Sequence, residues 1–65
     1  MEVTQIYHFA GPNFNKQANE FLHATYSRLT VTKVQTSETH IAIIGTARPA
    51  MCDEIWRSYL NICAK

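Results

Sequence analysis

The sequence has little of what marks a multidomain enzyme, a disulfide-rich scaffold or a disordered chain. Its 65 residues include two cysteines, two glycines and two prolines, and six basic residues nearly balance five acidic ones. Monomer scaling for this size allows one small core, which excludes a second domain and a deep enclosed active site. The residues present are 46% hydrophobic and 17% charged, which is the composition of a folded domain.

Long apolar runs are also absent from the sequence. No stretch approaches the run of about 18 apolar residues typical of a membrane-spanning helix, and residues 1–5 lack the basic, apolar pattern of a signal peptide. We therefore expect a soluble cytoplasmic protein. Cys52 and Cys63 would lie about 16 Å apart on one helix, whereas a disulfide needs Cα atoms within about 7 Å. The two cysteines therefore cannot pair with each other, and we expect small apolar residues on a buried helix face; the alternatives are an intermolecular disulfide or a reactive thiol.

Motifs for catalysis are missing as well. The sequence contains no nucleophile elbow, phosphate loop or paired-cysteine motif, and His8, His23 and His40 lack metal-binding spacing. We therefore expect no catalytic residue, no metal and no cofactor, and a protein that acts by binding. The near-neutral charge argues against nucleic acid as the partner. A weaker alternative is an enzyme that uses His8, His40 or Cys52.

The first half of the chain predicts a strand followed by a helix. β-branched and aromatic residues over 3–10 favour a strand, and the Gly-Pro pair after it is typical of a turn. Over residues 14–29, apolar positions recur every three or four residues, which predicts one face of a helix. The side chain of Asn13 or Asn15 is suited to cap its first turn.

The second half predicts a hairpin and a second helix. Residues 30–36 and 39–44 are rich in β-branched residues typical of strands, and Gly45 is expected to end the second of them. Pro49 suits the first turn of a helix. The apolar stripe of this helix comprises Cys52, Ile55, Trp56, Tyr59, Ile62 and Cys63.

The order strand, helix, strand, strand, helix predicts an α+β fold with a three-stranded sheet. A right-handed β-α-β unit makes the first two strands parallel, and the hairpin makes the third antiparallel to both. We expect a single domain over residues 1–65, a ferredoxin-like two-layer sandwich truncated before its last strand. The third strand, which is the most apolar, should lie in the middle.

Truncation would leave the outer edge of the first strand open, and an open edge invites a partner. The sheet face away from the helices would carry one of two alternating sets. One set is Ile6, His8, Ala10, His40, Ala42 and Ile44; the other is Val3, Tyr7, Phe9, Ile41 and Ile43. We predict a homo-oligomer, most simply a two-fold dimer that pairs first strands or packs sheet on sheet. The predicted interface residues are Ile6, Tyr7, His8, Phe9 and Ile44.

Two strand-to-helix loops are the best candidates for a ligand site. Each offers backbone N–H groups, a glycine, an amide or hydroxyl side chain and a cation, as an anion or phosphate requires. The candidate ligand-binding residues are Asn13, Asn15 and Lys16 in one loop and Thr46 and Arg48 in the other. The two loops should lie at opposite ends of one subunit. Antiparallel pairing of two first strands would bring them together across the subunit boundary.

These features predict a small, non-catalytic binding or regulatory protein, a homo-oligomer that sequesters a phosphate-bearing small molecule or nucleotide at subunit boundaries. The alternative is a protein-protein interaction module, an inhibitor or adaptor, that uses the first-strand edge or the open sheet face.

The segment Asn19-Glu20-Phe21-Leu22, followed by the hairpin over residues 31–44, resembles small sporulation-associated proteins of Bacillus. Those proteins have a strand, a helix ending in an N-x-F-L-like segment, and a hairpin. The resemblance covers residues 3–44 and implies a short bacterial cytoplasmic protein without an assigned activity, so it transfers no site residue. The second helix departs from that pattern, and a bacteriophage origin is equally compatible with the size.

Overall fold

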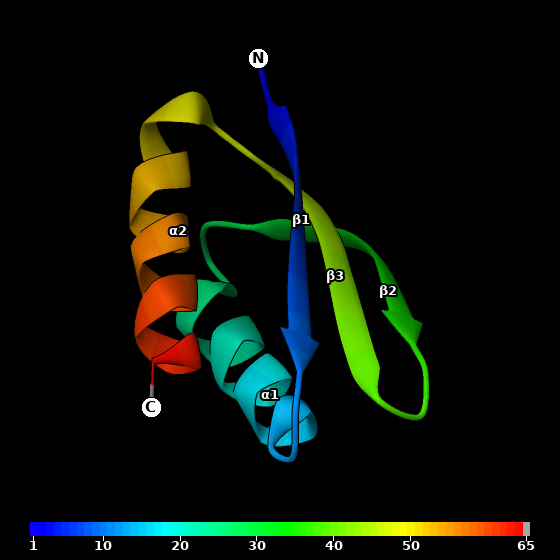
Figure 1. The fold of residues 1–65 in the computed structure, drawn as a ribbon. Coiled ribbons are helices and arrows are strands. Elements are labelled where there is room, and N and C mark those ends of the chain that lie inside the picture. Colours follow the sequence, from blue (N-terminus) through cyan, green and yellow to red (C-terminus); the bar gives the residue numbers. More distant parts are fainter. Residues whose placement is uncertain (65) are drawn as a thin grey trace.

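The computed structural model describes residues 1–64 as two layers, a three-stranded sheet and two helices on one of its faces (Figure 1). The α+β class and the order strand, helix, strand, strand, helix are those predicted from the sequence. The elements are β1 (Val3–Ala10), α1 (Phe14–Thr25), β2 (Thr30–Thr36), β3 (His40–Ala47) and α2 (Pro49–Cys63).

The sheet has the strand order β1-β3-β2, and both neighbouring pairs are antiparallel. In its middle, Ile43 of β3 lies opposite Tyr7 of β1 and opposite Val34 of β2. The prediction that the most apolar strand occupies the centre is confirmed. A bulge between Val31 and Lys33 interrupts the regular pairing of β2.

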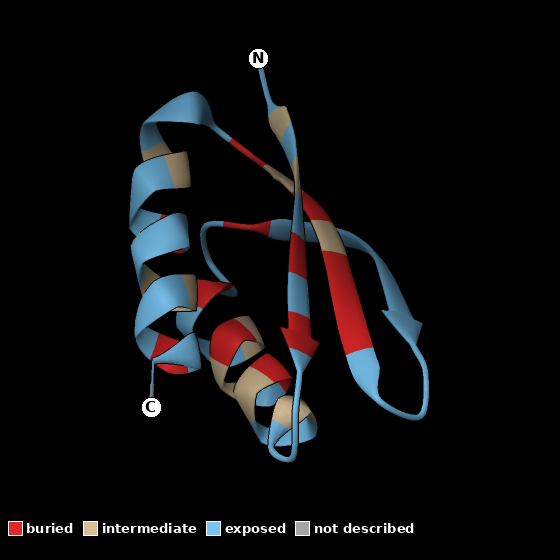
Figure 2. Cartoon of the chain, viewed as in Figure 1, coloured by how far each residue is buried: buried red, intermediate tan, exposed pale blue. Residues whose placement is uncertain are grey.

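The core lies between the sheet and the helices (Figure 2). Alternate side chains of a strand point to opposite faces, so Tyr7 and Phe9 share the helix-facing side of β1. They pack with Phe21 of α1, whose ring centroid lies 4.7 Å from that of Tyr7 and 5.4 Å from that of Phe9. These three side chains are at most 1% exposed. The helices are therefore anchored mainly over β1 and β3.

Gly45 does not end β3, as the sequence predicted, but lies inside it. A Cβ atom at Gly45 would be 2.8 Å from the Thr30 carbonyl oxygen and 3.0 Å from the side chain of Leu29. The glycine therefore allows the start of β2 to approach β3 closely, and the strand continues to Ala47. A small residue inside a strand often marks such a close backbone approach.

The first helix is shorter than its apolar periodicity predicts. It ends at Thr25, whose carbonyl oxygen accepts hydrogen bonds from the N–H groups of Arg28 and Leu29, at 2.9 and 2.8 Å. Leu29 nevertheless reaches the core from the following turn. Asn13 holds the N-cap position, but its side chain makes no capping hydrogen bond, contrary to expectation.

The apolar stripe of α2 is only partly buried. Ile55 and Ile62 lie in the core, whereas Trp56 and Cys63 of the same stripe are exposed. Within residues 1–64, no helix combines the length and the apolar character that crossing a membrane requires. Cys52 and Cys63 form no disulfide with each other, as predicted, but Cys52 is only half-buried and Cys63 is exposed, so the predicted burial of both is wrong.

Candidate functional site

At His8, Tyr59 of α2 covers part of the outer edge of β1, which the sequence predicts to be open. The Tyr59 hydroxyl donates a hydrogen bond of 2.6 Å to the backbone carbonyl of His8. In Figure 1, α2 runs along the side of the sheet that β1 forms. Covering an edge with a helix is a common way in which proteins block unwanted strand pairing. At His8 the pairing of two β1 strands therefore has to displace Tyr59.

Two predicted interface residues belong to the core instead. Tyr7 and Phe9 point toward the helices and are buried, so their side chains are out of reach of a partner. This corrects the predicted interface to its remaining members, Ile6, His8 and Ile44. The physical reason is the period of two along a strand, which places Ile6 and His8 on the opposite face.

The sheet face away from the helices carries the first of the two alternating sets. Ile6 pairs with Ile44 at its centre, and Ile6 is 53% exposed. Ala42 is buried although no helix covers this face; its register partners are His8 on β1 and Gln35 on β2. The face thus has a narrow apolar centre with polar side chains beside it. It is less apolar than predicted from β1 and β3, because β2 contributes polar residues such as Gln35.

The second edge strand, β2, is exposed on both of its faces (Figure 2). All seven of its residues are exposed, including Val31 at 38% and Val34 at 47%. The register places these two valines opposite Gly45 and Ile43, which are buried on the helix-facing side. Neither helix lies over β2 as it does over β1 and β3, so the valines remain in contact with solvent.

The predicted anion-binding residues lie at opposite ends of the subunit, as expected (Figure 1). Asn13 and Lys16 border a shallow depression of about 220 Å³ at the start of α1, which Glu20 also lines; the remaining candidate of this loop, Asn15, is exposed beside them. At the other end, the Thr46 hydroxyl donates a 2.9 Å hydrogen bond to the Glu2 carboxylate. Each half of the proposed composite site therefore contains a carboxylate, which opposes an anion.

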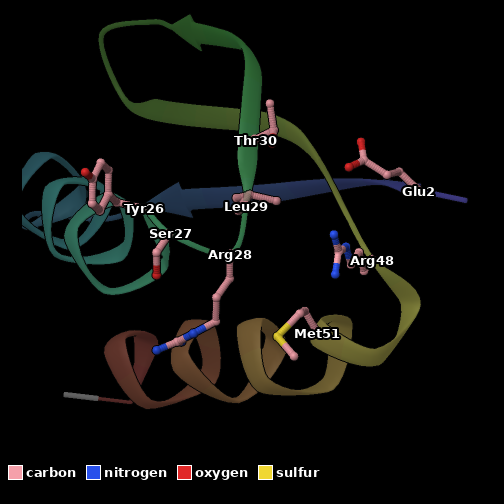
Figure 3. A pocket seen from close by; sticks show the side chains of 8 residues that line it. All are labelled: Glu2, Tyr26, Ser27, Arg28, Leu29, Thr30, Arg48 and Met51. Atoms are coloured by element: carbon pink, nitrogen blue, oxygen red, sulfur yellow. The ribbon is translucent and has the colours of Figure 1, made fainter.

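A larger depression, of about 410 Å³, lies between the turn after α1 and the start of α2 (Figure 3). Its lining includes Arg48, which is a predicted ligand-binding residue, and a second arginine, Arg28. The lining residues are Glu2, Tyr26, Ser27, Arg28, Leu29, Thr30, Arg48 and Met51. Sequence reasoning did not select Arg28, because it lies 20 positions from Arg48 and belongs to no motif. Its place just after the last apolar turn of α1 is the only signal.

The residues considered for catalysis do not converge. His8 and His40 lie on the open face of the sheet, and the Nδ1 atom of His40 is 2.8 Å from the Ser37 hydroxyl. Cys52 lies on α2, on the other side of the sheet, where its thiol donates to the Arg48 carbonyl at 3.5 Å. Among residues 1–64 no group of three or more His, Cys, Asp or Glu side chains could hold a metal ion.

Two tyrosines, Tyr7 of β1 and Tyr59 of α2, have raised pKa values. Burial raises the pKa of Tyr7, and the nearby Cys52 adds to this shift. Burial also raises the pKa of Tyr59, with a further contribution from Cys63, and the hydrogen bond to His8 partly offsets the rise. The Tyr7 hydroxyl has no hydrogen-bond partner in the described part of the chain. Neither tyrosine lines the depressions described above; Tyr7 belongs to the core, and Tyr59 packs against it.

No protein-family model, curated protein or solved structure matches this chain. The resemblance to sporulation-associated proteins therefore stays a prediction, and the functional argument rests on the surfaces described above.

Proposed function

We propose that the protein is a non-catalytic interaction module that associates through β2. The partner that binds to β2 is a second copy of the chain. The supporting observation is that β2 is exposed on both faces although it carries Val31 and Val34 on the side where the rest of the sheet forms the core. Exposed apolar residues next to an unpaired strand edge are a common feature of association sites.

The two edges of the sheet make β2 the better candidate for strand pairing. At β1, the Tyr59 hydroxyl already occupies an outward-facing carbonyl. At β2, the bulge between Val31 and Lys33 disturbs one part of the edge, and the regular pairing with β3 resumes at Lys33. We therefore expect the contact to run over residues 33–36, with main-chain hydrogen bonds supplying the affinity.

A two-fold axis at Val34 gives an arrangement without charge conflict. Antiparallel pairing about this axis places Val34 opposite Val34 of the second copy and Lys33 opposite Gln35 of the second copy. A cross-strand valine pair contributes favourably, and like charges directly opposite each other are avoided. The result is a six-stranded sheet whose helices all lie on the same side. Because each pair of helices lies over β1 and β3, they stay clear of the new contact.

The compartment we propose for this association is the cytoplasm. Cys52 and Cys63 are both unpaired thiols, and unpaired cysteines are characteristic of proteins kept in a reducing compartment.

Light scattering coupled to size-exclusion chromatography tests the proposal. At tens of micromolar, we expect the mass of a dimer for the natural chain and of a monomer for Val34→Lys, because two lysines would then face each other. The matched control is Ile6→Lys, an equally exposed apolar residue on the other sheet face, which should remain dimeric. A monomeric natural chain, or a dimer lost in Ile6→Lys and kept in Val34→Lys, contradicts the use of β2.

A further inference from the structure

The depression between the turn after α1 and the start of α2 has the size of a small-molecule site. Its volume of about 410 Å³ falls in the range of about 300 to 1,000 Å³ that ligand pockets occupy. Figure 3 shows Arg28 extending from the turn toward α2, and Arg48 lying between Glu2 and Met51. Both side chains line the depression from different walls, and in Figure 3 the Arg28 guanidinium points away from Arg48.

Neither arginine is neutralised within the part of the chain that the structure describes. Arg28 and Arg48 form no ion pair with a carboxylate of residues 1–64, and Arg28 reaches only the backbone carbonyl of Ala24, at 3.4 Å. Glu2 lines the same depression, but its Oε1 atom accepts the hydrogen bond from the Thr46 hydroxyl. Two cations and one carboxylate leave the depression with an excess of positive charge.

The other lining groups suit an organic phosphate better than a bare ion. Hydroxyl groups of Ser27 and Thr30 add donors. The ring of Tyr26 borders the depression and is 83% exposed, which leaves its aromatic surface free to contact the organic part of a ligand. Arginine is the side chain best matched to phosphate, because its planar group donates two parallel hydrogen bonds.

We infer that this depression binds a small phosphate-bearing molecule, with Arg28 and Arg48 donating to its phosphate oxygens. Because the two arginines lie on different walls, a diphosphate group that reaches both should bind more tightly than a single phosphate. This site lies within one chain, is independent of the association through β2, and differs from the composite of Thr46, Arg48 and the first loop that the sequence predicted.

A titration of the full chain, followed by the backbone amide signals in nuclear magnetic resonance, tests the site. The probes are inorganic phosphate, inorganic pyrophosphate, adenosine diphosphate and adenosine. We expect saturable shifts at residues 27–30 and 48–51 with the three phosphate probes, and tighter binding of pyrophosphate than of phosphate. Tighter binding of adenosine diphosphate than of pyrophosphate would show that the nucleoside part contacts Tyr26. Equal binding would overturn the role of Tyr26 and leave a site for phosphate groups only. Adenosine alone should cause no saturable shift.

Variants with a matched control separate the site from general charge effects. Arg28→Gln and Arg48→Gln should each weaken pyrophosphate binding about tenfold or more, the effect of losing a charged hydrogen bond. Arg57→Gln removes the same charge from an exposed position outside the depression and should leave binding unchanged. Glu2→Gln should tighten binding, because it removes the only carboxylate from the lining. Absence of saturable shifts with every phosphate probe, or equal weakening by Arg57→Gln, overturns the inference.

Discussion

The two edge strands of the sheet, β1 and β2, differ in composition and in surroundings: β1 carries the aromatic residues Tyr7 and Phe9, and β2 carries none. Both are rich in β-branched residues and both pair with β3. On β1 the helix-facing side chains are core residues, and Tyr59 of α2 binds its outer edge. On β2 every residue is exposed. The difference shows that the aromatic side chains of β1 give the helices a surface to pack on, whereas the β-branched side chains of β2 alone do not hold a helix over that strand.

Truncation of a core residue on β1 should have the largest effect. Phe9→Ala removes a fully buried ring that packs on Phe21 and Tyr59, and such a change costs about 3 to 5 kcal/mol. In a domain of this size that is enough to unfold much of the protein. Val34→Ala on β2 should change stability by about 0.5 kcal/mol or less, measured on the isolated monomer. Urea unfolding at low protein concentration checks both, and comparable losses would refute the contrast between the strands.

A methyl group at the junction of β3 and β2 should have the next largest effect. The added methyl group in Gly45→Ala pushes both the Thr30 carbonyl and the Leu29 side chain away from β3, at a cost of about 1 to 3 kcal/mol. Thermal unfolding measures this loss. Ala42→Gly, three positions away on the same strand, is a control that adds flexibility without crowding, with an expected cost of about 1 kcal/mol or less. An unchanged melting temperature for Gly45→Ala would mean that β2 is held loosely even where it enters the sheet.

Removing the hydroxyl group that covers the edge of β1 should have a smaller effect on stability. Tyr59→Phe keeps the ring in the aromatic cluster and loses only the hydrogen bond to the His8 carbonyl, at about 0.5 to 1.5 kcal/mol. The same variant opens the β1 edge, so we expect it to add association beyond the dimer. Light scattering at rising protein concentration detects this, and Tyr26→Phe, an exposed tyrosine far from that edge, is the control. Identical masses for the two variants would show that α2 blocks the edge without this bond.

Alkaline pH should give the smallest and most gradual effect. Burial raises the pKa of Tyr7 and Tyr59 above the ordinary value of about 10. Both phenols are neutral in the folded protein, and above pH 10 the unfolded chain loses these protons first. The stabilisation that comes from these two neutral phenols is therefore complete below about pH 10, and it is lost as the pH rises toward their pKa values in the folded protein. Melting temperatures measured between about pH 8 and 11 should stay nearly constant up to about pH 10 and fall above it.

The double variant Tyr7→Phe, Tyr59→Phe should flatten this alkaline decline, whereas Tyr26→Phe should not. The Tyr7 change alone should leave stability unchanged or raise it at neutral pH, because it removes a buried hydroxyl that has no partner among residues 1–64. A decline that persists in the double variant would assign the alkaline sensitivity to other groups.

The sequence supports the fold to a large extent and the candidate surfaces only in part. Apolar periodicity, the Gly-Pro turn after β1 and Pro49 at the start of α2 are local signals, and each element they predict is present. The position of Gly45 inside β3 could not be predicted from the sequence, because it depends on the close approach of Thr30, which lies 15 positions earlier. That Arg28 and Arg48 line the same depression was also not predictable, since it depends on how the turn after α1 packs beside α2.

By itself, the sequence determined the order of the elements, the central position of β3 and the two alternating sets of residues along the strands, because strand and helix periods are local properties of the chain. Which of the two sets faces the helices was decided by the packing. The tertiary structure alone decided that β1 is covered and β2 is not. The aromatic contacts of Phe21 and Tyr59 with β1 draw both helices to that side of the sheet, and β2, which has no aromatic side chain to pack against them, stays exposed.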